Sequence, residues 1–173
     1  TKKQRETVLV LDCSSSMHGR PLSEMKQSAI KFCEALMNGG GENYVEIVTF
    51  GTSASKSGFK NNLSDLTSYI NNISAYGSTN MYQGLSMASD ELNASDRKNS
   101  IQNIVVMSDG EPCEGSTQNS GVMSNWVSAH SGYSFYYSYA EKYGNAVCSL
   151  SDSLKADYNI YSLGFFHTMS ADE

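Results

Sequence analysis

The sequence predicts a doubly wound α/β domain, in which helices cover both faces of a mainly parallel sheet. Four short apolar runs stand out, and three of them are rich in Val and Ile and nearly continuous, as strands buried on both faces are. The segments between the runs carry apolar residues at every third or fourth position, which is typical of helices that pack one face on a sheet. Strands and helices that alternate in this way form right-handed crossovers in an open sheet. The four runs are Val8–Leu11, Val45–Phe50, Ile104–Met107 and Ile160–Phe166.

Each predicted helix has an apolar stripe, and the first two have recognisable boundaries. Pro21 suits a first helical turn, Gly39–Gly41 would end the first helix, and Asn62 is placed to cap the second. The short polar stretch Thr52–Lys60 alternates weakly and predicts a small antiparallel edge strand after a hairpin. The stripes run over residues 22–36, 63–73, 81–92 and 143–154.

Residues 112–139 do not follow this pattern. The segment is rich in Ser, Gly, Asn and Tyr, has few aliphatic residues, and is far longer than the usual connection of about 2–6 residues. Loops of this length are functional or disordered, and the density of aromatic residues argues against disorder. We therefore treat residues 112–139 as a functional insert.

Composition limits the kinds of protein that this chain can be. Its 173 residues fit a single domain, 1–173, that is large enough to enclose a core. The net charge is −6 and no run of Lys and Arg exceeds two residues, which excludes a binder that tracks nucleic-acid phosphates. No stretch approaches the ~20 apolar residues of a membrane helix, and the polar start Thr1–Glu6 is not a signal peptide. Because the chain lacks an initial Met and ends just after an apolar run, we expect a domain excised from a longer protein, without direct insertion into a membrane.

The four cysteines show no CxxC pair and no histidine at zinc-ligand spacing, so a structural zinc site is not expected. Cys113 follows the third apolar run and Cys148 falls in the last predicted helix, so a disulfide between them would pin the insert. Four free thiols are the alternative, as in a protein of the reducing cytosol.

Polar side chains gather where the predicted strands end. Asp12, Ser14 and Ser16 follow the first run, Asp109 follows the third, and Thr79 precedes the third helix. Ligands of open α/β sheets bind beyond the carboxyl ends of the strands, so these side chains are expected at one edge of the sheet. Carboxylates and hydroxyls are hard oxygen ligands, which suit Mg²⁺, Mn²⁺ or Ca²⁺ and do not suit zinc or copper.

These residues resemble the von Willebrand factor type A (vWA) domain and its metal-ion-dependent adhesion site (MIDAS). The family's three motifs occur in order, as D-x-S-x-S at Asp12–Ser16, G-S-T-N at Gly77–Asn80 and S-D-G at Ser108–Gly110, and the resemblance extends from Val8 to Phe166. It implies a Rossmann-like sheet of order 3-2-1-4-5 with the first strand central. It also implies that the hydroxyls of Ser14, Ser16 and Thr79 bind the metal directly. Asp12 and Asp109 would act largely through water or by hydrogen-bonding those hydroxyls.

The resemblance further implies a non-catalytic adhesion module that binds an Asp or Glu carboxylate of a partner protein through Mg²⁺, or through Mn²⁺ or Ca²⁺. We expect a bacterial surface or secreted protein, and hence an extracellular or cell-surface location. An enzyme is not expected, because Asp12 has no second acid two residues on and neither a G-x-S-x-G elbow nor a nearby histidine base is present. The insert would choose the partner through large aromatic contacts. The candidate contacts are Trp126, Tyr133, Tyr136, Tyr137 and Tyr139.

The alternative within the same family is an intracellular, cytoplasmic subunit of an ATPase-driven assembly or a metal chelatase. The cysteines discriminate between the two locations, since a Cys113–Cys148 bond favours the outside of the cell and four free thiols favour the inside.

Overall fold

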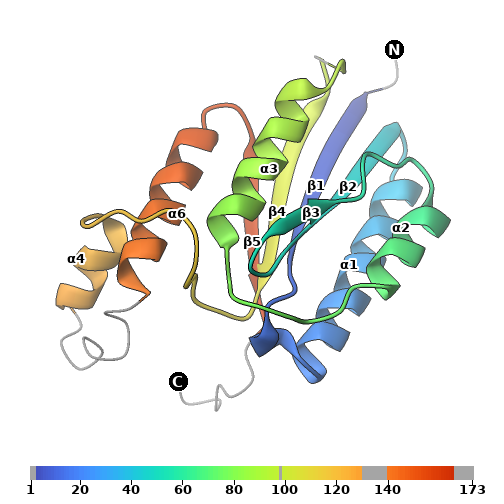
Figure 1. Ribbon diagram of the computed structural model, residues 1–173. Coiled ribbons are helices and arrows are strands. Elements are labelled where there is room, and N and C mark those ends of the chain that lie inside the picture. Colours follow the sequence, from blue (N-terminus) through green and yellow to red (C-terminus); the bar gives the residue numbers. More distant parts are fainter. Residues whose placement is uncertain (1–2, 98, 130–139, 166–173) are drawn as a thin grey trace.

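A computed structural model describes residues 3–97, 99–129 and 140–165 and shows a five-stranded sheet with helices on both faces (Figure 1). The strand order is β3-β2-β1-β4-β5, so the predicted fold class and the central first strand are confirmed. Only β3 is antiparallel to its neighbour, which confirms the predicted edge hairpin. The strands are β1 Gln4–Asp12, β2 Glu42–Phe50, β3 Ala54–Lys56, β4 Ile101–Ser108 and β5 Asn159–Gly164.

Two layers of helices enclose the sheet. The helices α1 (Arg20–Asn38) and α2 (Leu63–Asn71) cover one face, and α3 (Met81–Ala94) and α6 (Glu141–Leu154) cover the other (Figure 1). Two shorter helices, η1 (Ser15–Met17) and α4 (Val122–Ala129), follow β1 and β4 respectively. In the part of the chain that the structure describes, none of the helices combines the length and the apolar character needed to cross a membrane.

The helix boundaries form as local sequence signals predict. Pro21 lies in the first turn of α1, and Gly39 is the residue that ends it. The side chain of Asn62 accepts a hydrogen bond of 2.9 Å from the backbone N–H of Asp65, which caps α2. These boundaries were predictable because each depends on residues within one turn of the helix.

The core is divided by β1, which is buried on both faces. Leu9 and Leu11 pack with α1 and α2, whereas Val8 and Val10 pack with α3 and α6, and all four side chains are fully buried. By contrast, β5 is an edge strand whose Tyr161 is 57% exposed. The apolar run that predicted β5 is therefore only partly covered by the described residues.

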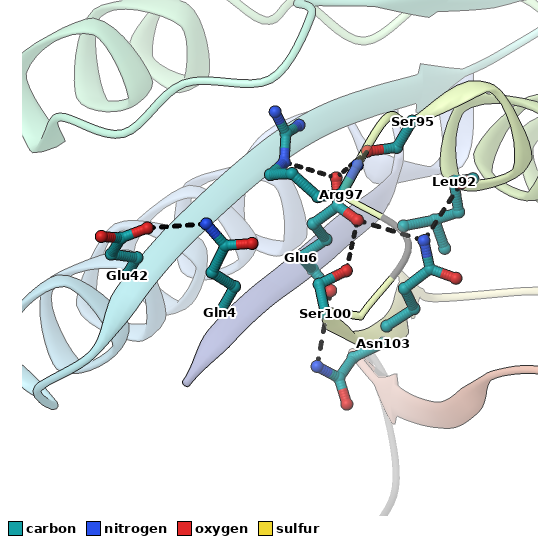
Figure 2. A network of polar contacts seen from close by, with 9 residues as sticks. Gln4, Glu6, Glu42, Leu92, Ser95, Arg97, Ser100 and Asn103 are labelled. Carbon is teal, nitrogen blue, oxygen red and sulfur yellow. Dashed lines mark hydrogen bonds and ion pairs between the residues drawn. The ribbon is translucent and has the colours of Figure 1, made fainter. Parts of the chain in front are cut away.

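Glu6 in β1 closes the end of the sheet opposite to the ends that carry the predicted metal ligands. Its carboxylate is fully buried, and four side-chain donors surround it at 2.5 to 3.1 Å (Figure 2). The donors come from the α3–β4 connection and the start of β4, so the network ties this connection to the central strand. They are the hydroxyls of Ser95 and Ser100, Nε of Arg97 and Nε2 of Gln102.

These donors keep Glu6 ionised although it is buried. Burial alone raises the pKa of a carboxyl, but hydrogen bonds from Ser100, Ser95 and Gln102 and the charge of Arg97 outweigh it, so the pKa of Glu6 lies below its ordinary value. Because the folded state lowers this pKa, the carboxylate stabilises the fold above the unfolded-state pKa. That stability is lost as the pH falls through the lowered value.

We predict that Glu6→Gln lowers the free energy of unfolding by about 2–4 kcal/mol at neutral pH, because an amide cannot accept from four donors. Glu42→Gln is the matched control: Glu42 accepts one hydrogen bond from Gln4, of 2.7 Å, and should lose less than about 1 kcal/mol. Urea unfolding at neutral and acidic pH measures both variants. Equal losses for the two would show that the Glu6 network does not hold this end of the sheet.

Candidate functional site

Three loops meet where β1 and β4 end, at the lower edge of the sheet in Figure 1. They carry the five predicted metal ligands, which we call the rim cluster. Side-chain contacts join three of its members in a row: the hydroxyls of Ser14 and Ser16 share a hydrogen bond of 3.0 Å, and Ser16 donates to Asp109 Oδ1 at 2.9 Å. The structure thus brings together residues that are 93 positions apart in the chain. The rim cluster is Asp12, Ser14, Ser16, Thr79 and Asp109.

Asp12 is the buried anchor of the rim cluster. Its side chain is fully buried and accepts from the backbone N–H of Ser14 at 2.8 Å and from the hydroxyl of Ser108 at 2.5 Å. Ser108 has a role that the motif alone did not assign. The parallel register pairs Leu11 with Met107, so Ser108 follows in the register position beside Asp12, and this register is the signal that could have identified it.

Thr79 joins the cluster through the backbone of its loop. Tyr76 donates its N–H to the carbonyl of Cys13 at 2.7 Å, and Ser15 donates to the carbonyl of Gly77 at 3.0 Å. The carbonyl of Thr79 accepts from the backbone N–H of Cys113 at 3.1 Å. Thr79 itself is buried, with 7% of its surface exposed. The loops of β1, β4 and α3 are therefore linked to one another by main-chain bonds.

The turn between β2 and β3 also supports the loop that carries Thr79. The carbonyl of Gly51 accepts from the N–H of Asn80 at 2.8 Å, and the hydroxyl of Thr52 accepts from the N–H of Ser78 at 3.1 Å. Asn80 also caps α3, because its side chain accepts from the N–H of Gln83 at 3.1 Å. Sequence reasoning missed this support, since Gly51 and Thr52 belong to no motif.

Electrostatics at the rim cluster favour a cation. Burial raises the pKa of Asp12, hydrogen bonds from Ser108 and Ser14 partly offset this, and the charge of Asp109 raises it further. Within residues 3–97, 99–129 and 140–165, the salt bridges involve other carboxylates, and no Lys or Arg pairs with Asp12 or Asp109. A divalent cation would supply the positive charge that this pair of carboxylates lacks.

The donor set also fits a hard divalent cation. In the described ranges, no three His, Cys, Asp or Glu side chains come together in an arrangement that could hold a metal ion. The rim cluster offers hydroxyl oxygens beside two carboxylates, and these are the ligands that Mg²⁺, Mn²⁺ or Ca²⁺ prefer. Ser14 is buried and Ser16 is exposed, so the hydroxyl row runs from the interior to the surface.

Of the insert residues that the structure describes, 112–129, the first few contact the loops of the rim cluster. Cys113 contacts Thr79 through the main-chain bond described above, and a Cβ at Gly115 would overlap the side chain of Asn80. Farther along the insert, α4 packs on α6 and lies at the margin of the molecule, well separated from η1 (Figure 1). Trp126 is on α4 and 39% exposed, and no described contact joins it to the rim cluster. The other predicted partner contacts, Tyr133, Tyr136, Tyr137 and Tyr139, lie outside the described residues.

The predicted disulfide is not formed. Cys113 and Cys148 are both free and half-buried, and the other two cysteines are free and buried. Cys113 is held next to Thr79 by its backbone N–H, and Cys148 lies on α6, where burial raises the pKa of its thiol. The insert is instead fastened by Asn145 of α6, whose side chain accepts from the N–H groups of Met123 and Ser124.

The fold and these loops agree with a comparison to known families. The sequence model of the von Willebrand factor type A domain family matches residues 7–111, which include all five residues of the rim cluster. The chain belongs to this family. The vWA fold that the motifs indicated is thereby confirmed.

Two curated relatives are inter-alpha-trypsin inhibitor heavy chains. Heavy chain H1 of Sus scrofa is 26% identical over 96% of this chain, and heavy chain H4 of Homo sapiens is 26% identical over 79%. This chain covers only 17% and 16% of the length of those two relatives. Solved structures of bacterial proteins also share the fold.

Two of these structures show the extent of the likeness. The vWF domain of a type V pili tip protein from Porphyromonas gingivalis has a TM-score of 0.61 and 23% identity, and the match covers 70% of this chain and 43% of that one. A von Willebrand factor type A protein from Catenulispora acidiphila has a TM-score of 0.66 and 13% identity, and the match covers 94% and 33% of the two chains.

The Thr79 loop depends on Gly77, which has a φ of 76°. A Cβ at this position would overlap Thr52 Oγ1 and lie 3.0 Å from Thr52 N, so Gly77→Ala should lower the free energy of unfolding by about 2–4 kcal/mol. Gly58→Ala is the control, because Gly58 has a φ of 74° but open space around it, and should cost about 1 kcal/mol. Urea unfolding compares the two variants, and a similar cost for both would mean that the contact with Thr52 does not fix the loop.

Proposed function

We propose that this domain is a non-catalytic binding module whose rim cluster is a metal-ion-dependent adhesion site. The site would hold Mg²⁺, or Mn²⁺ or Ca²⁺, and the bound cation would supply the positive charge that attracts a carboxylate of a partner protein. The proposal rests on the row of hydroxyls of Ser14 and Ser16 beside the carboxylates of Asp12 and Asp109. No described Lys or Arg forms an ion pair with either carboxylate.

The side chains of the rim cluster divide the work. Ser14, Ser16 and Thr79 would present neutral hydroxyl oxygens to the cation, which leaves most of its charge available to an outside anion. Asp12 holds the N–H of Ser14 and the hydroxyl of Ser108, and Asp109 accepts from Ser16. The two carboxylates therefore orient the loops and the hydroxyls that would face the cation.

The comparisons support a location outside the cell. A solved structure that shares the fold is named as the tip protein of a pilus, and another is named as a pilus adhesin from Lactobacillus rhamnosus. We extend the adhesive role and the surface or secreted location from these names to the present domain. Similar proteins occur in mammals as well as in bacteria, so these names do not point to one source organism.

The four free thiols favour a second candidate, an intracellular vWA subunit of an ATPase-driven machine. The metal site would be the same, but the partner would be another subunit of that assembly. Mass spectrometry of the protein from its native source distinguishes the two locations, because alkylation of four unpaired thiols supports the intracellular candidate and a native disulfide contradicts it.

Calorimetry with Mg²⁺ or Mn²⁺ tests the metal site. We predict that Asp12→Asn weakens binding at least about tenfold, or ~1.4 kcal/mol, because it removes a negative charge and loosens the loop that Asp12 orients. Asp152→Asn is the control, since Asp152 lies on the surface of α6 in an ion pair with Lys155 and should leave affinity unchanged. Absence of divalent-ion binding in the unsubstituted protein, or equal affinity of the Asp12 variant, would refute the metal site.

A further inference from the structure

A second buried glutamate, Glu46 of β2, is in a very different environment from Glu6. Its side chain is fully buried, and its Oε1 accepts one hydrogen bond, of 3.0 Å, from the backbone N–H of Gly58. The other oxygen, Oε2, has no hydrogen-bond partner. A buried carboxylate with one unsatisfied oxygen is costly, so this residue calls for an explanation beyond packing.

Two charged side chains face Glu46 from the elements packed against it. Lys56 approaches from β3 and Glu91 from α3, and these two form an ion pair with each other. From the connection after β3, the Gly58 N–H is the only polar group that the described residues direct at it. The single ammonium group of Lys56 thus lies near two carboxyl groups and pairs with that of Glu91. Glu46 is therefore more stable in this environment as a neutral acid than as a carboxylate.

This environment raises the pKa of Glu46. Burial, with the nearby Glu91 carboxylate adding to it, raises the pKa of Glu46 to about 7, and the Gly58 hydrogen bond and the Lys56 charge only partly oppose the shift. Since the folded state raises this pKa, the neutral form favours the observed fold at low pH. That contribution is lost as the pH rises through about 7.

Glu46 lies at the base of the β2–β3 hairpin, and the turn of this hairpin supports the Thr79 loop. The turn holds that loop through Gly51 and Thr52, as described above, and Thr52 also accepts from the side chain of Asn80 at 3.2 Å. Ala54 adds a hydrogen bond of 3.0 Å to Gln83 in the first turn of α3. Any movement of the hairpin relative to α3 therefore reaches the loop that carries a predicted metal ligand.

We propose that Glu46 is a proton-controlled positioning residue for the rim cluster. When Glu46 is neutral, Lys56 pairs with Glu91 and the hairpin stays closed on α3, so that the Thr79 loop is held. When Glu46 is ionised, it competes with Glu91 for Lys56 and draws water to its unpaired oxygen, which loosens the hairpin and the loop. The consequence for metal affinity rests on the proposed function, whereas the movement of the loop does not.

Nuclear magnetic resonance of the full chain without metal tests the coupling. We expect the Glu46 carboxyl to titrate near pH 7 and the amides of Ser78, Thr79 and Asn80 to shift with the same midpoint. In Glu46→Gln, which mimics the neutral acid and should fold normally, these amide shifts disappear. Titration of Glu46 near its ordinary value, or amides that do not follow it, would overturn the proposal.

Two variants separate the specific effect from general ones. Glu91→Gln removes the competing carboxylate, so Lys56 can pair with Glu46 and the midpoint should fall below that of the unsubstituted protein. Asp152→Asn alters a surface ion pair on α6 and should leave both the midpoint and the loop amides unchanged. An unchanged midpoint in Glu91→Gln would contradict the shared use of Lys56.

A second experiment measures the affinity for Mn²⁺ between about pH 6 and pH 8. Relative to Glu46→Gln, the unsubstituted protein should lose about threefold in affinity over this range, because ionised Glu46 loosens the loop that binds the ion. If neither protein binds Mn²⁺ at any pH, the proposed function fails and the amide titration alone decides the coupling. Parallel pH profiles for the two proteins would overturn the coupling to the site.

Discussion

Removing a carboxylate from water is the physical constraint on which this structure depends. Each buried, ionised carboxyl costs several kcal/mol unless hydrogen-bond donors or a cation replace its water. Glu6 and Asp12 lie at opposite ends of the central strand and are both fully buried. Glu6 receives four side-chain donors and closes its end of the sheet, whereas Asp12 shares its end with Asp109 and is completed, in our proposal, by a divalent cation. Glu46 has one donor, and its charge is therefore the one that can be switched off near neutral pH.

Much of the fold was predictable because its signals are local or follow from the family. The Val-rich run at residues 8–11 predicted a strand buried on both faces, and Pro21 and Asn62 predicted helix boundaries that form as expected. The exposure of β5 was not predictable from its apolar run, since a run shows that a strand can be buried but not what covers it. The four thiols are free in the structure, and the positions of Cys113 and Cys148 in the sequence could not decide between a disulfide and free thiols.

The rim cluster was predictable as a set of residues but not as a structure. The motifs identified all five members because each follows a strand or precedes a helix at one edge of the sheet. The supporting contacts from Thr52 and Ser108 depend on how neighbouring strands are registered and how a hairpin turns, which no single motif records. Glu46 is the extreme case: in the sequence it is one of two polar residues within the apolar run Val45–Phe50, and its unpaired oxygen is visible only when α3 and β3 are packed around it.

A cation held by the rim cluster should keep one coordination position open for an outside carboxylate, and water on the ion reports this position. Water-proton relaxation by protein-bound Mn²⁺ reports the number of water molecules on the ion. We predict that acetate lowers this relaxation by displacing water, that acetamide of similar size does not, and that Asp12→Asn requires at least about tenfold more Mn²⁺ to reach the same enhancement. Equal effects of acetate and acetamide, or an enhancement in Asp12→Asn at the same Mn²⁺ concentration as in the unsubstituted protein, would refute an open coordination position at the rim cluster.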